Sequence, residues 1–176
     1  SHLTEFSYLK FSILSKDKKV RENINQDKNN NEMMIMKKRK TFAKATKELR
    51  EQLGSRKVLL EGDRKFMASF DSSKLSFEYD ALIRARADAD VGIVLKLANA
   101  HNVPVTARGA GTSLTGSASP VRGGWVLDMS LMKRIAIRKE KAMAVVQPGA
   151  VVADIQAAAD AEGLFYPPDP SSLKYC

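Results

Sequence analysis

The sequence predicts an α+β fold that contains a β-α-β unit, and three observations support this prediction. Two short apolar runs, residues 103–107 and 125–129, are typical of buried strands. A helix with a one-sided apolar stripe precedes the first run, and this helix follows another short strand at residues 80–86. Two further segments, on either side of a charged triplet at residues 139–141, indicate a separate hairpin.

Three helices are predicted from apolar side chains spaced three and four residues apart. The first begins after residue 40 and stops at Gly54, since glycine commonly terminates helices. The second begins at Asp88, its expected N-cap, and closes at His101, and the third closes at Gly163. The side chains predicted to face the core are Phe42, Ala45, Leu49 and Leu53, then Val91, Val94, Leu95 and Ala98, and finally Val152, Ile155, Ala158 and Ala159.

The basic charge is concentrated near the N-terminus. Of the net charge of +9 over 176 residues, +5 lies in residues 1–40, and within them residues 16–31 have almost no apolar side chains. Such a segment buries too little surface to offset the entropy of ordering it. We therefore predict a flexible basic tail at residues 1–39 and a single domain at residues 40–176. The tail is either native or extraneous sequence, and the three methionines between residues 33 and 36 are candidate native starts.

Several classes of protein are excluded by composition. No run approaches the roughly 20 apolar residues of a membrane-spanning helix, and the N-terminus lacks the pattern of a secretory signal. The only cysteine, Cys176, excludes an internal disulfide, and one cysteine with two histidines excludes a Cys/His zinc site. We expect a cytoplasmic protein with no transmembrane segment and no nucleic-acid partner, because no folded basic face is indicated.

The segment with the clearest chemistry is a glycine-rich loop after the strand at residues 103–107. Its sequence is Arg108-Gly109-Ala110-Gly111-Thr112-Ser113-Leu114-Thr115-Gly116. Glycines allow positive φ and let successive N–H groups converge, which creates a concave anion site suited to a phosphate or pyrophosphate. Hydroxyl groups of Thr112 and Ser113 would add donors, and Arg108 would either touch the anion or form a structural ion pair.

Glycine content alone does not identify the ligand. No Lys-Ser/Thr pair follows the last glycine, so the loop is not a Walker A motif. The spacing of Gly109, Gly111 and Gly116 also departs from the G-x-G-x-x-G dinucleotide fingerprint. A tight connection that binds nothing therefore remains an equally good interpretation of the loop by itself.

Wider context resembles a known family. Residues 103–116 resemble the pyrophosphate loop of FAD-linked oxidases of the vanillyl-alcohol-oxidase type, which carry the PCMH-type FAD-binding domain. The segments at residues 123–130, 146–150 and 163–171 resemble the family's next strand, its V-x-P-G step and the segment that leads to the flavin. The last is typical of the branch that contains the glycolate oxidase FAD-linked subunit and D-lactate dehydrogenases. The resemblance covers about residues 79–176.

The resemblance implies a two-part FAD-binding fold, of which this chain would be the N-terminal part: the β-α-β subdomain and the start of the second subdomain. It implies non-covalent FAD, because Thr112 stands where some relatives carry the histidine that bonds the flavin. On this basis Gly111→Asp is expected to abolish flavin retention and to leave the fold largely intact. The residues expected to hold the cofactor are Ala107, Arg108, Gly109, Ala110, Gly111, Thr112, Ser113, Gly116, Pro168 and Asp169.

The family's next motif, a T-I-G-G-N stretch, is not present before Cys176, and neither is the substrate cap. No catalytic residue is therefore assigned, and the sequence is interpreted as an N-terminal fragment that is inactive alone. The function implied by the resemblance is the FAD-binding portion of a flavin-dependent oxidoreductase. Its substrate would be a 2-hydroxy acid such as glycolate or D-lactate, and its partner an electron-acceptor subunit. The alternatives are a non-catalytic nucleotide-binding module or a piece of a split complex, and an RNA-binding protein with a basic tail.

Overall fold

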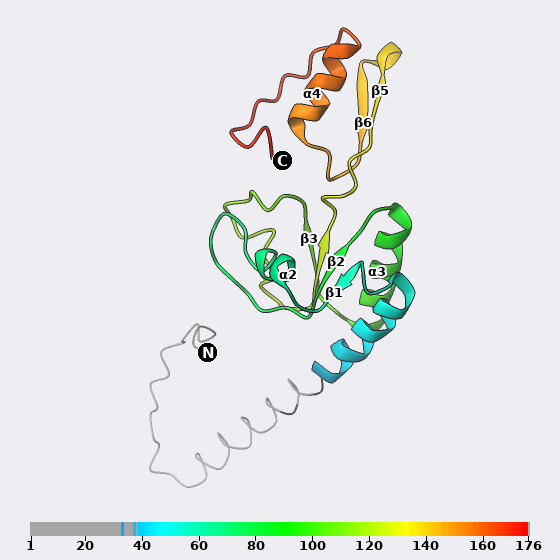
Figure 1. Ribbon diagram of the computed structural model, residues 1–176, viewed down its shortest axis with the longest axis vertical. Helices are drawn as coiled ribbons and strands as arrows, with labels where there is room; N and C mark the ends of the chain where they lie inside the picture. The colour runs from blue at the N-terminus through cyan, green and yellow to red at the C-terminus, as the bar shows by residue number, and fades with distance from the viewer. Residues whose placement is uncertain (1–32, 34–36, 38, 176) are drawn as a thin grey trace. The chain divides into compact units, whose positions relative to one another are not determined.

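The computed structural model describes Met33, Lys37 and residues 39–175. The predictions for residues 1–32, for Met34 and Met36 and for Cys176 lie outside the described residues. A helix that includes residues 39–53 comes first, and a compact unit begins at Thr41. The elements that follow in Figure 1 are β1 (Val58–Leu59), α2 (Asp63–Met67), β2 (Ala81–Arg84), α3 (Asp88–His101), β3 (Val105–Arg108), β4 (Trp125–Asp128), β5 (Ile135–Arg138), a 3₁₀ turn (Lys139–Lys141), β6 (Met143–Val146) and α4 (Val152–Ala161).

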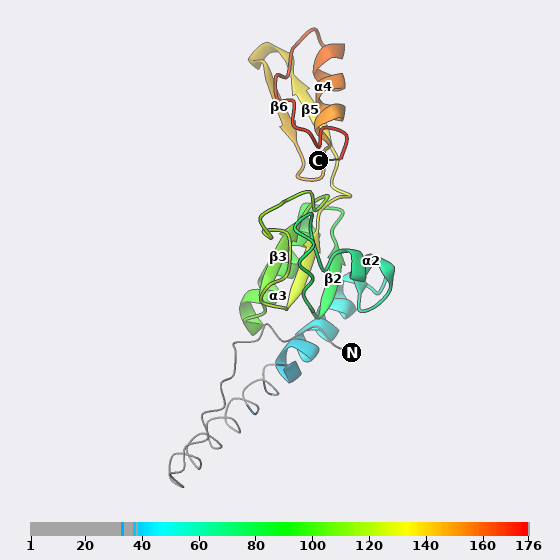
Figure 2. The same cartoon turned by 90° about the vertical axis from the view of Figure 1, so that its left-hand side faces the viewer.

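The first sheet confirms the predicted β-α-β unit. Its strand order is β1-β2-β4-β3, with β2, β4 and β3 parallel and the short β1 antiparallel at the edge. Helix α3 connects β2 to β3, and β4 then enters the sheet between these two strands (Figure 2). The three parallel strands end in register, so Arg84, Asp128 and Arg108 form a row at their carboxyl ends.

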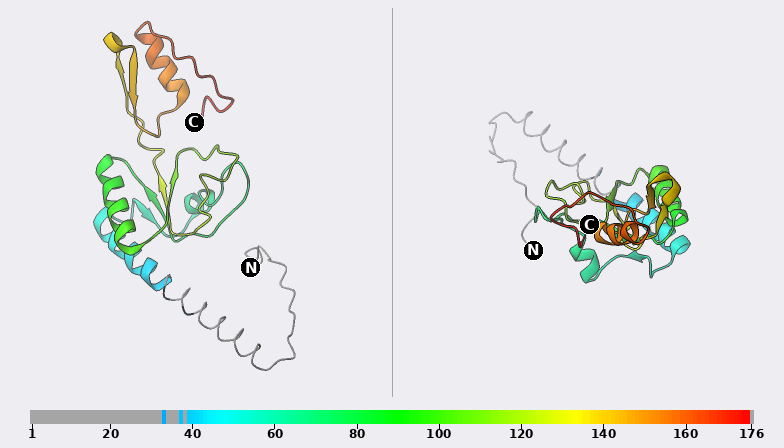
Figure 3. Two further views of the ribbon diagram at one scale, coloured as in Figure 1. Left: turned by 180° about the vertical axis from the view of Figure 1, so that it is seen from behind. Right: turned by 90° about the horizontal axis from the view of Figure 1, so that it is seen from above.

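Alternate residues of a strand point to opposite faces of the sheet, and here both sets are apolar. Ile83 and Leu127 belong to one core cluster, which also contains side chains of the helix at residues 39–53 and of α3; these two helices run together in Figure 3. Leu82 and Val126 belong to a second, smaller cluster with Tyr79 and Ala68. A central strand covered on both faces is therefore apolar at successive positions, as Trp125, Val126 and Leu127 of β4 are.

Trp125 packs in the core, as expected for the apolar run at residues 125–129. Its side chain is fully buried, and its indole Nε1 donates a hydrogen bond of 2.8 Å to Thr46 Oγ1. Thr46 in turn donates to the Phe42 carbonyl one helical turn earlier, at 2.7 Å. This chain of hydrogen bonds satisfies both buried polar groups and joins the first helix to β4.

Two details of the predicted α3 are wrong. Asp88 is not the N-cap: Ala87 takes that position with φ −149°, and no side chain caps the helix there. Asp90 instead accepts the Arg86 N–H at 2.9 Å, which is why this acid is buried. The apolar stripe is also displaced, since Leu97 is buried and Leu95 is half-exposed.

The predicted hairpin and third helix are present. Strands β5 and β6 pair antiparallel as a separate two-stranded sheet, with Ile135 opposite Val146, and α4 packs against β5. In α4 the buried side chains are Ile155 and Ala159, and Gly163 follows the helix with φ +71°. The mixed α and β fold class expected from the sequence is confirmed.

Candidate cofactor site

The glycine-rich loop leaves the carboxyl end of β3, an edge strand of the parallel sheet. Among the described residues, none of the five main-chain N–H groups from Gly109 to Ser113 donates a hydrogen bond to another protein group. Four of these five residues are partly buried. Main-chain N–H groups that no protein group accepts are free to donate to water or to a ligand, so this loop can offer them to an anion.

Gly111 needs to be glycine for two reasons. Its φ is +76°, a conformation that residues with a Cβ rarely adopt. A Cβ at this position would also overlap the guanidinium of Arg108 and would lie 2.8 Å from its Nη1 atom. The guanidinium therefore occupies the space beside the loop that a side chain at residue 111 would otherwise fill.

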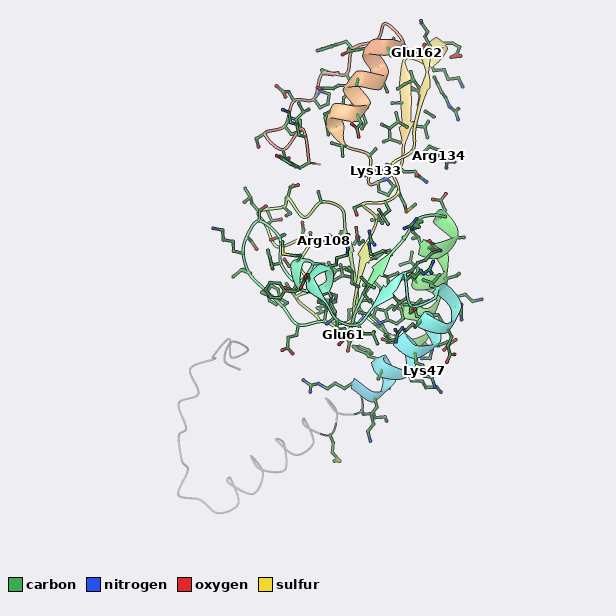
Figure 4. The ribbon with its side chains drawn as sticks, viewed as in Figure 1. Lys47, Glu61, Arg108, Lys133, Arg134 and Glu162 are labelled. Carbon is green, nitrogen blue, oxygen red and sulfur yellow. The ribbon has the colours of Figure 1, made fainter. Side chains whose placement is uncertain are left out.

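Arg108 is engaged with the main chain on both sides of the loop. Its Nη1 donates to the Phe70 carbonyl at 2.7 Å and to the Ala118 carbonyl at 3.3 Å. Its Nη2 donates to the Met67 carbonyl at 3.3 Å, which places the side chain beside α2 (Figure 4). The sequence left two roles open for Arg108, an anion ligand or a partner in a structural ion pair. The observed contacts are structural, but they are made to carbonyl groups and not to a carboxylate.

Charges of both signs gather at the carboxyl ends of the parallel strands. Asp128 lies between Arg84 and Arg108 in the register, and its Oδ2 is 3.8 Å from Arg84 Nε. Burial lowers the pKa of the Arg108 guanidinium, and the carboxylates of Asp128 and Asp71 oppose that shift. The carboxyl edge of a parallel sheet is where α/β folds commonly bind ligands, and here the two arginines outnumber the central acid.

Asp71 is a buried acid near the loop. Its side chain is only 3% exposed, and its Oδ1 accepts the Ser73 N–H at 2.9 Å. Hydrogen bonding from Ser73 holds the pKa of Asp71 below its ordinary value, with smaller contributions from Ala118 and Ser119. Asp71 is therefore ionised at neutral pH, close to the segment that follows the loop.

Three hydroxyl groups meet at the outer part of the loop. Ser113 Oγ lies 3.0 Å from Thr115 Oγ1 and 2.9 Å from Ser117 Oγ, and it accepts the Thr115 N–H at 3.2 Å. Hydroxyl hydrogens rotate freely, so this cluster can turn donors outward without moving the backbone. Ser113 is thus placed to add a donor beside the main-chain N–H groups.

Of the other residues predicted to hold the cofactor, two flank residues 109–113 in the sequence and two lie after α4. Ala107 is the exposed third residue of β3, and Gly116 has φ +76° with open space around it. Pro168 and Asp169 are exposed and follow α4, where the Pro168 carbonyl accepts a 2.9 Å hydrogen bond from Gln156 Nε2. Within the described part of the chain, no hydrogen bond connects these two residues to the loop.

Sequence reasoning missed Asp71, Arg84 and Asp128 as parts of the site. Arg84 and Asp128 stand at the ends of predicted strands, and their position there was an available signal, since parallel strands place their carboxyl ends together. Asp71 precedes Arg108 by 37 residues in a segment with no helical or strand pattern. Nothing local in the sequence marks it.

Comparison with known proteins agrees with this geometry. Residues 79–176 match the family described as FAD binding domain, and the chain belongs to this family. The residues present fit a diphosphate group, because the glycine cradle at residues 109–113 offers unbonded N–H donors beside the Arg108 guanidinium.

The chain is 36% identical to the glycolate oxidase subunit GlcD of Bacillus subtilis (strain 168) over 140 residues, covering 73% of this chain and 29% of that protein. It is also 36% identical to a D-lactate dehydrogenase of Anaerostipes hadrus over 92 residues, covering 52% of this chain and 19% of that protein. The chain thus spans less than a third of the length of these relatives.

Two solved structures share the fold. A p-cresol methylhydroxylase with bound substrate aligns with a TM-score of 0.60 and 28% identity, over 70% of this chain and 25% of that one. An alkyldihydroxyacetonephosphate synthase aligns with a TM-score of 0.68 and 18% identity, over 76% of this chain and 30% of that one, which shows the fold alone.

In the described residues no helix is both long enough and apolar enough to cross a bilayer.

Proposed function

We propose that this chain is the FAD-binding portion of a flavin-dependent oxidoreductase that oxidises a 2-hydroxy acid of the glycolate or D-lactate type. The observation that carries the proposal is the row of five unbonded N–H groups at residues 109–113 in a member of the FAD binding domain family. The similarity to a glycolate oxidase subunit and a D-lactate dehydrogenase supports the substrate class.

The loop would hold the pyrophosphate of FAD. The N–H groups of residues 109–113 would donate to its oxygens, with the hydroxyls of Thr112 and Ser113 as further donors. Ala107 would lie against the same group, and Gly116 would let the chain turn away. Arg108 contributes its positive charge beside Gly111. Pro168 and Asp169 would approach the cofactor from the segment after α4.

When bound, FAD supplies the chemistry, because it accepts the hydrogen that leaves the substrate's α-carbon as hydride. We propose that FAD is held non-covalently, since residue 112 is a threonine whose hydroxyl is a poor attachment point for a flavin. The described histidine, His101, lies at the end of α3, where its Nε2 is 3.2 Å from Glu48. Electrons would then pass to an acceptor, proposed to be a partner subunit, and the proposed compartment is the cytoplasm.

A second candidate function is a nucleotide-binding module without turnover, acting alone or as one part of a split complex. The observation that favours it is the set of main-chain N–H groups at residues 109–113, which suit a nucleotide diphosphate whatever chemistry follows binding. Such a module would bind FAD through the same loop, so the two candidates differ only in the oxidation step.

Two measurements test the proposal. FAD titration followed by denaturation and filtration should release all flavin into the filtrate, whereas flavin retained on the denatured chain would contradict non-covalent binding. Anaerobic addition of glycolate or D-lactate to the flavin-loaded protein should bleach the flavin absorbance. Flavin binding without bleaching by either acid would favour the module, and the absence of flavin binding would overturn both candidates.

A further inference from the structure

Arg108 is the point where three separate segments of the chain meet. Its guanidinium donates to carbonyls of Met67 and Phe70 on one side and of Ala118 on the other. The same group fills the space beside Gly111 in the middle of the loop. The segment before β2, the loop and the segment after the loop are therefore all held by one side chain.

This geometry leaves the guanidinium committed to the protein. Both of its terminal nitrogens donate to main-chain carbonyls, and the planar fork fixes the directions of these hydrogen bonds. A lysine ammonium has neither the width nor the fixed plane to reach carbonyls on two segments at once. Arg108 is thus placed to shape the loop and not to swing toward a ligand.

The carboxylate of Asp71 adds to this arrangement. Asp71 adjoins Phe70, whose carbonyl accepts the shortest of the Arg108 hydrogen bonds, at 2.7 Å. It is 3% exposed, its Oδ1 accepts the Ser73 N–H, and its Oδ2 has no hydrogen-bond partner in the described part of the chain. The Asp71 carboxylate therefore fixes the turn that follows Phe70, in the segment to which Arg108 donates.

We propose that Arg108 and Asp71 are positioning residues that set the glycine-rich loop in its anion-binding geometry before any ligand arrives. Asp71 fixes the turn after Phe70, whose carbonyl accepts from the guanidinium, and the guanidinium keeps Gly111 and its neighbours in place. This proposal rests on the proposed function only for the identity of the anion, the pyrophosphate of FAD. The effect on the loop exists without FAD.

The sign of the Asp71→Asn effect distinguishes positioning from simple electrostatics. If Arg108 and Asp71 acted only through their charges on a bound diphosphate, removal of the Asp71 charge would strengthen FAD binding. If they position the loop, Asp71→Asn weakens FAD binding, by about tenfold on our account. The matched control is Asp63→Asn, which removes an exposed acid from α2 and should leave the affinity within twofold.

Amide hydrogen exchange of the ligand-free protein provides the second readout. The Ser119 N–H donates to the Gly116 carbonyl, and the Phe77 N–H donates to the Ser69 carbonyl, on the two segments held by Arg108. In Arg108→Met and Arg108→Lys, exchange of both amides should rise at least tenfold. The Trp125 N–H, which donates to the Pro104 carbonyl within the sheet, should exchange as before. Arg122→Met, which removes an exposed cation, serves as the control.

Three results would overturn the proposal. Stronger FAD binding by Asp71→Asn would show a purely electrostatic role. A second such result is FAD affinity near that of the wild type in Arg108→Lys but not in Arg108→Met, with unchanged hydrogen exchange of the Ser119 and Phe77 amides. This result would make Arg108 a direct ligand of FAD. Equal acceleration of Trp125 exchange would reduce Arg108 to a general contributor to stability. If the wild-type chain binds no FAD, the proposed function fails, and the exchange measurements still decide the positioning role.

Discussion

Strands β4 and β6 have the same length of four residues and similar apolar character, but their surroundings are opposite. Trp125, Val126 and Leu127 of β4 are almost completely buried, whereas all four residues of β6 are exposed. The difference arises because β4 has a strand on each side and apolar side chains packed on both faces, while β6 pairs with β5 alone in its sheet. Apolar sequence makes a strand possible, and the layers around it determine how much free energy it contributes.

This difference matters for the site. The glycine-rich loop leaves β3, which pairs with β4, so its starting point is attached to the well-packed sheet. The segments before and after the loop are fixed to it by Arg108. The side chains of β6 that remain exposed include Met143, Val145 and Val146, a row of apolar groups on an unpaired edge.

The largest expected effect comes from comparing a buried side chain of β4 with an exposed side chain of β6. Trp125→Ala should lower the free energy of unfolding by about 3–5 kcal/mol, because it leaves a large cavity and removes the hydrogen bond to Thr46. Val145→Ala on β6 should cost less than about 0.5 kcal/mol, since the side chain is 48% exposed. Urea denaturation of both variants tests the contrast, and equal losses would contradict it.

Two glycines with nearly the same φ provide the next comparison. Gly124 has φ +75° and Gly116 has φ +76°, so alanine incurs a similar conformational cost of about 1–2 kcal/mol at each. A Cβ at Gly124 would overlap the Pro104 carbonyl oxygen and lie 2.9 Å from Pro104 Cδ, whereas nothing lies within 4 Å at Gly116. Gly124→Ala should therefore cost about 1–3 kcal/mol more in the free energy of unfolding. Thermal melts that show equal losses of stability in Gly124→Ala and Gly116→Ala would contradict this prediction, because β3 and β4 would then move apart at little cost.

A smaller effect distinguishes two ion pairs. Lys57 Nζ lies 2.6 Å from Asp90 Oδ1 beside the sheet, and Lys139 Nζ lies 3.8 Å from Glu162 Oε2 beside the hairpin. Asp90→Asn should lower the free energy of unfolding by about 1–2 kcal/mol, since a buried hydrogen-bonded charge is lost. Glu162→Gln should change it by less than about 0.5 kcal/mol, as exposed pairs contribute little.

Acid gives the same pair a second test. Burial by itself would raise the pKa of Asp90, but hydrogen bonds from Lys57 and Arg86 hold that pKa below its ordinary value of 3.8. Because the folded state has the lower pKa, the carboxylate stabilises the fold above the ordinary value, and this contribution disappears as the pH falls through the lowered pKa. Melting temperatures should therefore fall less steeply below pH 4 in Asp90→Asn than in the wild type. Identical slopes would contradict the assignment.

Much of the fold was predictable because its signals are local. Periodicity identified the helices at residues 39–53 and 88–101 and the third helix, and apolar runs identified the buried strands. Strand β1 has two residues and α2 has five, and neither is long enough to show a period. The Asp88 N-cap failed because Asp90, two residues later, makes the hydrogen bond that fixes the start of α3.

The loop itself was predictable from its glycines, but its supports were not. Arg108 meets Met67 and Phe70 only through the tertiary fold, across 41 and 38 residues. This contact also changes the best experiment. The change Gly111→Asp would displace the Arg108 guanidinium as well as occupy the pyrophosphate position. A loss of flavin binding in this variant would therefore not distinguish a disturbed loop from a blocked pyrophosphate site. Gly109 avoids the problem, since its φ is not positive and the nearest atom to an added Cβ is 3.9 Å away.

FAD titration of Gly109→Asp is therefore the most direct test of the central claim that this loop holds the cofactor's pyrophosphate. The negative charge would lie in the loop whose N–H groups are proposed to bind the pyrophosphate, and we predict at least a hundredfold loss of FAD affinity with an unchanged melting temperature. Leu114→Asp places the same charge on a side chain of the loop that is 76% exposed, and it should change the affinity by less than threefold. Equal affinities for Gly109→Asp and the wild type would contradict the claim.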